Sequence, residues 1–143
     1  MMLTAARKIH FAYGHRVWKH ESKCKYFHGH NGVVWIYARS PELDSLGRVI
    51  DFSVLKEKVG GWIDEHWDHG FIYNVDDVET RTILKSLKEK KIYALAGNPT
   101  AENMANYLLR DVCPKVLFNT GVEVYKIVFY ETENCFAEVS LDV

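Results

Sequence analysis

The fold is decided by residues 6–40, ARKIHFAYGHRVWKHESKCKYFHGHNGVVWIYARS, in which two strand patterns flank a polar loop. The first pattern spans Ala6–Val17, where the alternate residues from Ile9 to His15 share one face of an extended chain. The second spans His30–Ser40 and is apolar on both faces, which is expected when both sides of a strand are covered. We therefore predict two adjacent antiparallel strands joined by the polar loop.

The rest of the chain contains three helical patterns and two further strand patterns. A helix begins at Asp51 or Ser53 and extends to His66, although Gly60-Gly61 weakens its middle. The other predictions are a short helix over Val78–Lys91, a firmer helix after the N-cap Thr100, and strands over Val122–Thr132 and Phe136–Val143. The order β-β-α-α-β-β predicts a single domain, residues 1–143, of the α+β class. We expect an antiparallel four-stranded sheet with helices on one face.

Composition limits the functional classes. The chain has 143 residues, 48% hydrophobic and 26% charged, with a formal net charge of -1. These values predict a soluble globular protein without a general affinity for nucleic acid or membranes. No export signal opens the sequence, and no apolar run approaches the roughly 20 residues that span a bilayer, so we expect a cytoplasmic location. The three cysteines form no CxxC pair, which favours free thiols; we expect Cys113 and Cys135 in the core.

Histidines give the sharpest chemical signal. His28 and His30 point the same way from an extended chain, and antiparallel pairing brings His15 opposite them. Three imidazoles with one open position are typical of catalytic zinc, and they leave the ion at +2 to polarise a bound oxygen. The alternatives are ordinary loop histidines, or a closed structural zinc site with Cys24 as the fourth ligand.

Cys24 and the pair Asp68–His69 are candidates for proton transfer. A thiol beside a divalent ion and Lys23 is expected to have a lowered pKa and to act as a base. It could instead bind the metal or be an inert loop residue. Asp68 can hold the His69 imidazole in one tautomer, which is how a proton shuttle is commonly built. Taken alone, this pair fits a polar helix end equally well.

Other polar residues are candidates for substrate binding. Glu131 ends an apolar strand, where its carboxylate could accept two parallel N–H bonds from a guanidine-like edge or simply be an exposed charge. Glu102 and the N-cap Thr100 begin a helix, so the carboxylate of Glu102 compensates the helix dipole and could also meet substrate. Four cations crowd the polar loop and could bind a polyphosphate or remain solvated: Arg16, Lys19, Lys23 and Lys25.

Several motifs occur together in one order along nearly the whole chain. They are FAYGH (11–15), CKYFHGHN (24–31), WDHGFIYN (67–74), PTAEN (99–103) and ET-x4-A (131–137). With these motifs the chain resembles the 6-pyruvoyltetrahydropterin synthase / 6-carboxytetrahydropterin synthase family. The three residues between Cys24 and His28 resemble the 6-carboxytetrahydropterin synthases of queuosine biosynthesis, since the pyruvoyl-forming enzymes usually have a longer gap. One departure is Tyr13, where a smaller residue is common.

The resemblance implies the tunnelling fold, in which ββααββ subunits join into a β-barrel, commonly a hexamer built from two trimers with active sites between subunits. It implies Zn²⁺ on His15, His28 and His30, Cys24 as base, Asp68–His69 as its proton-handling partner and Glu131 on a pterin. The implied reaction converts 7,8-dihydroneopterin triphosphate to 6-carboxy-5,6,7,8-tetrahydropterin, triphosphate and acetaldehyde. Alternatives are the pyruvoyl-forming reaction, a pterin side-chain aldolase, and a structural zinc or silent pterin-binding protein.

Overall fold

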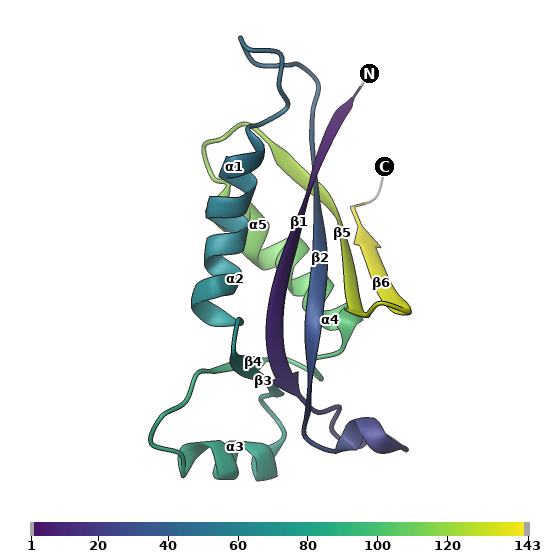
Figure 1. Ribbon diagram of the computed structural model, residues 1–143, viewed down its shortest axis with the longest axis vertical. Helices are drawn as coiled ribbons and strands as arrows, with labels where there is room; N and C mark the ends of the chain where they lie inside the picture. Colours follow the sequence, from purple (N-terminus) through teal and green to yellow (C-terminus); the bar gives the residue numbers. More distant parts are fainter. Residues whose placement is uncertain (1, 142–143) are drawn as a thin grey trace.

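One six-stranded sheet organises the computed structural model, which describes residues 2–141 (Figure 1). Its strands are β1 (Leu3–His15), β2 (His28–Ser40), β3 (Gly70–Asn74), β4 (Ile92–Leu95), β5 (Glu123–Thr132) and β6 (Cys135–Ser140). They lie in the order β4-β3-β1-β2-β5-β6. The four predicted strands are present, and those parts of the last one that fall on Asp142 and Val143 lie outside the described residues.

The predicted four-stranded antiparallel sheet is wrong in one respect, because β3 and β4 extend it on the β1 side. β3 runs parallel to β1, with Tyr13 opposite Gly70, and β4 runs parallel to β3. The sheet is therefore mixed rather than purely antiparallel. Figure 1 shows these two short strands at the end of the sheet where β1 terminates, next to α3 (Val78–Lys85). The segment that follows β4 thereby reaches His15, whose Nδ1 lies 2.7 Å from the Pro99 carbonyl oxygen.

The first long helix is continuous despite Gly60-Gly61. It comprises α1 (Phe52–Leu55), a π-helical segment η2 (Lys56–Gly60) and α2 (Gly61–His66), and Asp51 caps it by accepting from the Ser53 N–H. Its inward face is fully buried, with Leu55, Val59 and Ile63 all at 0% exposure. Burial of each such side chain is worth about 1.5–3 kcal/mol, which outweighs the cost of about 1 kcal/mol for each glycine.

The second long helix follows β4 and comprises α4 (Ala101–Tyr107), a π-helical segment η3 (Leu108–Val112) and α5 (Cys113–Val116). Thr100 caps it as predicted, since its Oγ1 accepts a hydrogen bond from the Asn103 N–H at 3.1 Å. The third helix, α3, is shorter than its predicted span and begins at the N-cap Asp77.

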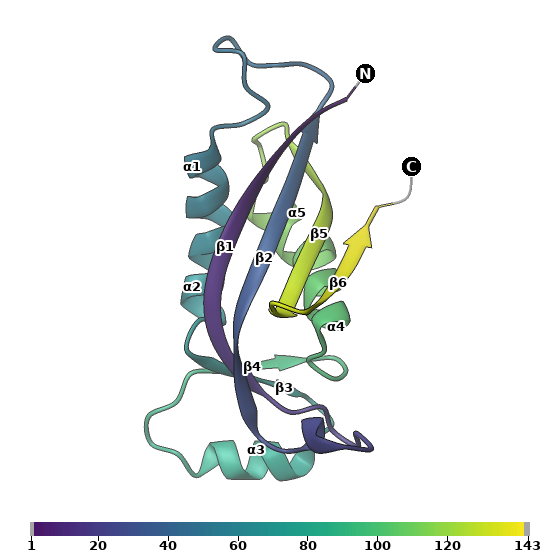
Figure 2. The same ribbon diagram turned by 45° about the vertical axis from the view of Figure 1, so that its right-hand side comes forward.

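Both long helices cover the same face of the sheet, and the core lies between them and β1, β2 and β5 (Figure 2). Cys113 is buried there as predicted, whereas Cys135 is exposed because it follows the tight β5–β6 turn. The opposite face carries half-buried aromatic side chains with cations over their rings. Lys126 Nζ, for example, lies 4.2 Å from the centre of the Tyr37 ring. Among residues 2–141, no helix is long and apolar enough to cross a membrane.

Candidate metal centre

The β1–β2 ladder brings the three predicted histidines together. In its register His15 lies opposite His28, and Tyr13 lies opposite His30, so all three imidazoles project from the same face at the end of the ladder. Gly29 sits between the two histidines of β2 because the neighbouring strand leaves little room: a Cβ there would lie 3.1 Å from the Tyr13 carbonyl oxygen. The predicted convergence of the three rings is confirmed.

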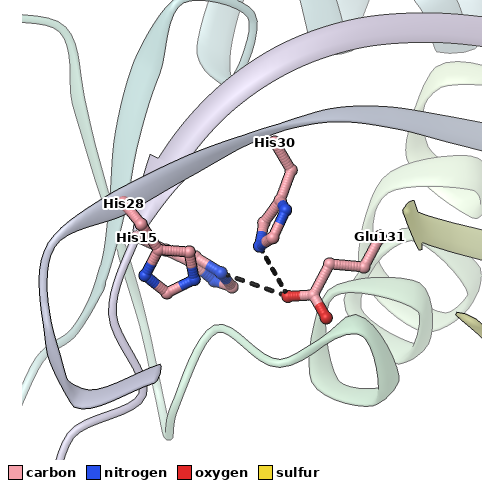
Figure 3. A group of neighbouring side chains, drawn as sticks. All are labelled: His15, His28, His30 and Glu131. Atoms are coloured by element: carbon pink, nitrogen blue, oxygen red, sulfur yellow. Dashed lines mark ion pairs between the residues drawn. The ribbon is translucent and has the colours of Figure 1, made fainter. Parts of the chain in front are cut away.

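Glu131 completes a four-residue cluster with the histidines. It lies near the end of β5, and one ligand atom from each of the four residues falls within 4.8 Å of the others. Figure 3 shows the three rings and the carboxylate directed toward a common point. Glu131 Oε1 lies 3.1 Å from the Nε2 atoms of both His15 and His30. The cluster can hold a metal ion.

Hydrogen bonds to backbone carbonyls determine which imidazole nitrogens are free. His15 Nδ1 is 2.7 Å from the Pro99 carbonyl oxygen, and His28 Nδ1 is 2.6 Å from that of Tyr26. A carbonyl oxygen can only accept, so each Nδ1 carries the proton and each Nε2 of the neutral ring presents a lone pair. In proteins, metal-binding histidines are commonly oriented in this way, by a hydrogen bond from the nitrogen that does not face the metal.

The buried Nε2 atoms and the Glu131 carboxylate face one another in an arrangement that fits a bound cation. The Nε2 atoms of His15 and His30 are buried and, in the part of the chain that the structure describes, make no hydrogen bond of good geometry, although the Glu131 oxygen lies 3.1 Å from each. Lone pairs facing a carboxylate repel it unless a proton or a cation lies between them. Burial lowers the pKa of His30, outweighing the opposing effect of Glu131, so the neutral ring is favoured. The donor set of three imidazoles and a carboxylate therefore fits a divalent ion.

The Glu131 carboxylate is kept ionised beside the three histidines. The 3.1 Å contact with His15 lowers the pKa of Glu131, and the other nearby imidazoles add to this effect against the opposing effect of burial. An ionised carboxylate can act as a metal ligand or accept N–H bonds from a substrate. The geometry allows either role.

Cys24 lies apart from the four ligands. It occupies the short 3-10 turn η1 (Lys23–Lys25), is half-buried, and does not belong to the four-residue ligand cluster found in residues 2–141. The turn is attached to the end of β1 through the Val17 N–H, which donates to the Cys24 carbonyl at 2.8 Å. The thiol therefore sits on the loop that joins the two ligand-bearing strands.

Asp68 and His69 form the predicted pair. His69 Nδ1 lies 2.9 Å from Asp68 Oδ2, and Asp68 Oδ1 accepts from the Ala12 N–H at 2.9 Å. His69 adopts a left-handed conformation with φ 59°, and this turn allows adjacent side chains to meet. Its side chain is 81% exposed. Burial raises the pKa of Asp68, but the hydrogen bonds from Ala12 and His69 lower it by more, so the carboxylate is ionised.

The cation-rich loop differs from the prediction at one residue. Arg16 is not free to bind a polyphosphate, because its guanidinium donates to Asp77 and Glu79 at 2.6–2.9 Å. Its partners are 61 and 63 residues away in sequence, so the loop alone could not indicate them. Lys19 remains available, with its Nζ 4.5 Å from the Trp18 ring centre.

A groove adjoins the cluster and is large enough for a small heterocycle. Its volume is about 620 Å³, and its lining includes His30, Glu131, Thr132, Trp35 and Tyr130. Pockets of a few hundred cubic ångströms with aromatic walls and a few polar groups are typical of small-molecule sites. Thr100 and Glu102 do not line this groove: the Thr100 hydroxyl caps α4, and Glu102 is exposed in the first turn of that helix.

Two further groups lie beside the cluster: the Pro99 carbonyl, which was not predicted, and Tyr13, which the alternation of β1 places on the same face as His15. The Pro99 carbonyl, the partner of His15, carries no side-chain signal and could not be found from sequence. Among the described residues 2–141 the buried Tyr13 hydroxyl has no hydrogen-bond partner, and its ring centre lies 5.1 Å from that of His15. Burial, and to a lesser extent the charge of Glu131, raises the pKa of Tyr13, so this phenol stays protonated.

Comparison with known proteins agrees with the fold and the cluster. Residues 4–142 match the family model described as 6-pyruvoyl tetrahydropterin synthase, and the chain belongs to this family. It is 40% identical over 138 residues to the 6-carboxy-5,6,7,8-tetrahydropterin synthase of Rickettsia conorii, covering 96% of this chain and 100% of the relative. It is 31% identical to the protein of the same name from Aquifex aeolicus, covering 93% of this chain and 94% of the relative.

Solved structures give the same fold. An uncharacterized protein from Wolinella succinogenes superimposes with a TM-score of 0.85 at 26% identity, covering 99% of both chains. The 6-pyruvoyl tetrahydropterin synthase of Plasmodium vivax superimposes with a TM-score of 0.74 at 17% identity, covering 100% of this chain and 99% of the other. At such an identity the second likeness concerns the fold alone.

Proposed function

We propose that this chain is a zinc-dependent 6-carboxy-5,6,7,8-tetrahydropterin synthase that acts on 7,8-dihydroneopterin triphosphate. The observation that carries the proposal is the convergence of three imidazoles and Glu131 beside a groove of about 620 Å³. The 40% identity to the R. conorii synthase, over its whole length, supports the carboxy-forming reaction over the other reactions of pterins.

The protein's own groups supply binding and proton transfer. A zinc ion on His15, His28 and His30 would supply Lewis-acid polarisation of the hydroxyl groups on the substrate side chain. Cys24 takes a proton from the side-chain carbon, and triphosphate leaves by elimination. Asp68 holds His69 with the proton on Nδ1, so its Nε2 is free to accept or return a proton. Tautomerisation moves side-chain hydrogens onto the pyrazine ring and leaves a carbonyl group beside it. Water adds to that carbonyl carbon, and cleavage of its bond to the next side-chain carbon releases acetaldehyde and leaves the carboxylate.

Glu131 is proposed to hold the amino-pyrimidinone edge of the pterin. It lines the groove, and its Oε1 lies 3.1 Å from the Nε2 atoms of His15 and His30. Glu131→Gln tests this role, because the amide keeps the shape but can accept only one of two parallel N–H bonds. We expect zinc content to be retained and KM to rise. Loss of zinc together with activity would make Glu131 a ligand instead.

The active enzyme is proposed to be an oligomer, a hexamer of two trimers, with each site shared between subunits. The exposed His69 ring and the sheet face without helices, lined by half-buried aromatic residues, favour such contacts. Mixing Cys24→Ala subunits with His69→Ala subunits under exchange conditions tests the sharing. Recovered activity is expected when one site takes the thiol and the imidazole from different chains. A mixture of the two inactive variants that remains inactive after subunit exchange has been verified would contradict the sharing of sites between subunits.

Product analysis tests the reaction itself. Purified, zinc-loaded protein is incubated with 7,8-dihydroneopterin triphosphate, and the products are identified by mass. A carboxypterin with acetaldehyde and triphosphate is expected. A pyruvoylpterin would indicate the 6-pyruvoyl reaction, glycolaldehyde would indicate an aldolase, and an unchanged substrate would favour a silent pterin-binding or structural zinc protein.

A further inference from the structure

Asn98 connects three segments of chain that surround the metal centre. It lies between β4 and α4, and its Oδ1 accepts from the Trp18 N–H and from Asn74 Nδ2, both at 3.1 Å. Its Nδ2 donates to the Trp18 carbonyl at 2.9 Å, and its own carbonyl accepts from Asn103 Nδ2 at 2.9 Å. The amide side chain therefore fastens the chain after β1 to the end of β3, and the backbone carbonyl of the same residue contacts the start of α4.

The next residue is Pro99. Its carbonyl oxygen accepts a buried hydrogen bond of 2.7 Å from His15 Nδ1. Asn98 therefore connects to His15 in two ways. Its side chain is hydrogen-bonded to the backbone of Trp18, three residues after His15, and the residue that follows it, Pro99, supplies the carbonyl that orients the His15 imidazole. A shift of the Asn98 backbone would move that carbonyl relative to the ring.

We propose that Asn98 is a positioning residue for the metal centre. Its side chain sets the distance between the Trp18 backbone and the Pro99 carbonyl, and this distance determines the tautomer and direction of the His15 ring. Metal sites require ligands held within about 0.5 Å and 10–20° of the productive geometry, and outer groups that orient a ligating histidine supply that precision. The inference rests on the metal centre of the proposed function.

Metal affinity measures this role directly. Metal-free wild type, Asn98→Ala, Asn98→Asp and Asn106→Ala are titrated with Zn²⁺ in competition with a chromophoric chelator. Asn98→Ala is expected to bind zinc about 10- to 100-fold more weakly, the range found for outer-shell partners of ligands. Asn98→Asp keeps both acceptor contacts but replaces the donor to the Trp18 carbonyl with an oxygen, so its affinity is also expected to fall.

Asn106→Ala is the matched control. Asn106 is an exposed asparagine of α4 whose side chain contacts only Arg110, at 3.1 Å, among the hydrogen bonds of residues 2–141. This variant is expected to keep the wild-type affinity. Spectra of Co²⁺-loaded proteins give a second measurement, since a misdirected His15 changes the ligand-field bands while a distant loss of stability does not.

The outcomes separate the two proposals. A wild type that takes up no zinc overturns the metal centre and with it the proposed function. A wild type that binds zinc, with Asn98→Ala matching it in affinity and Co²⁺ spectrum, overturns the positioning role alone. If circular dichroism shows Asn98→Ala to be unfolded, Asn98→Asp decides, because it keeps the shape of the side chain and removes its donation to the Trp18 carbonyl. An unchanged affinity there overturns the inference.

Discussion

Replacing Arg16 with alanine would leave a buried carboxylate without its main partner. Arg16 Nε and Nη2 donate to the two oxygens of Asp77 at 2.7 and 2.6 Å. The Asp77 side chain is 1% exposed and that of Arg16 is 14% exposed. The pair also joins the residue after His15 to the N-cap of α3, so its loss affects the part of the fold that carries the metal centre.

The magnitude follows from what remains around Asp77. Removing one partner of a buried ion pair costs about 3–5 kcal/mol, because the other charge stays buried. Asp77 keeps two hydrogen bonds, from Thr80 Oγ1 at 2.6 Å and from the Thr80 N–H at 3.1 Å. We therefore expect Arg16→Ala to lower the free energy of unfolding by about 3 kcal/mol, the lower end of that range.

Urea unfolding of the metal-free protein measures this loss, at one protein concentration for all variants because association shifts the transition. The matched control is Arg48→Ala. Arg48 also contacts two carboxylates, Asp44 at 2.9 Å and Asp51 at 3.2 Å, but it is 43% exposed. Exposed pairs contribute about 0–1 kcal/mol. Equal losses in the two variants, both under about 1 kcal/mol, would refute the reasoning about burial.

The pH dependence gives an independent check. Burial raises the pKa of Asp77, but the hydrogen bonds from Arg16 and Thr80 lower it by more, and the net shift is downward. A carboxyl group with a lowered folded pKa stabilises the protein above its unfolded pKa of about 3.9 and loses that contribution as the pH falls through the folded pKa. The difference in the free energy of unfolding between wild type and Arg16→Ala should therefore have its whole magnitude at pH 7 and become smaller below about pH 4. A difference that grows in acid would contradict this sign.

Three further outcomes are expected. Cys24→Ala should keep its zinc and lose turnover, measured by metal analysis beside an assay of triphosphate release; loss of both would identify the thiol as a ligand. Charge reversal at Lys19 and Lys23 should raise KM for the triphosphate substrate far more than for its dephosphorylated form, and equal effects would remove the phosphate-binding role. Burial raises the pKa of Cys113 to about 12, so a thiol reagent at neutral pH should label the exposed Cys135 and leave Cys113 unmodified until the protein is denatured. Mass mapping of labelled peptides distinguishes these two sites.

Sequence patterns predicted the long strands and missed the short ones for a physical reason. β1 and β2 each extend over 13 residues, long enough for alternation of exposed and buried side chains to be visible. β3 (GFIYN) and β4 (IYAL) have five and four residues and do not alternate apolar with polar side chains, so the strand period is absent from their sequences. Their existence depends on pairing with strands far along the chain, such as Tyr13 with Gly70, and no local pattern encodes that contact.

The candidate site was predictable in so far as it depends on strand register. The convergence of His15, His28 and His30 follows from a two-residue period and antiparallel pairing, both visible in the sequence. The direction of Glu131 carried a weaker signal, its shared parity with the buried Phe129 on β5. The Pro99 carbonyl had none, since every residue has a carbonyl and only the tertiary fold selects this one.

The uninterrupted pairing of β1 with β2, from Leu3 opposite Ser40 to His15 opposite His28, keeps the two proposed chemical tasks on different parts of the chain. The ladder sets the spacing of the imidazoles, whereas the connection between the strands carries the thiol that we propose as the base. An insertion or deletion between Lys19 and Lys25 would spare the contacts of Trp18 and Tyr26 that help to orient His15 and His28, and would move the thiol at position 24. The proposed proton-abstracting group could therefore change during evolution, and the product with it, without rebuilding the proposed ion site.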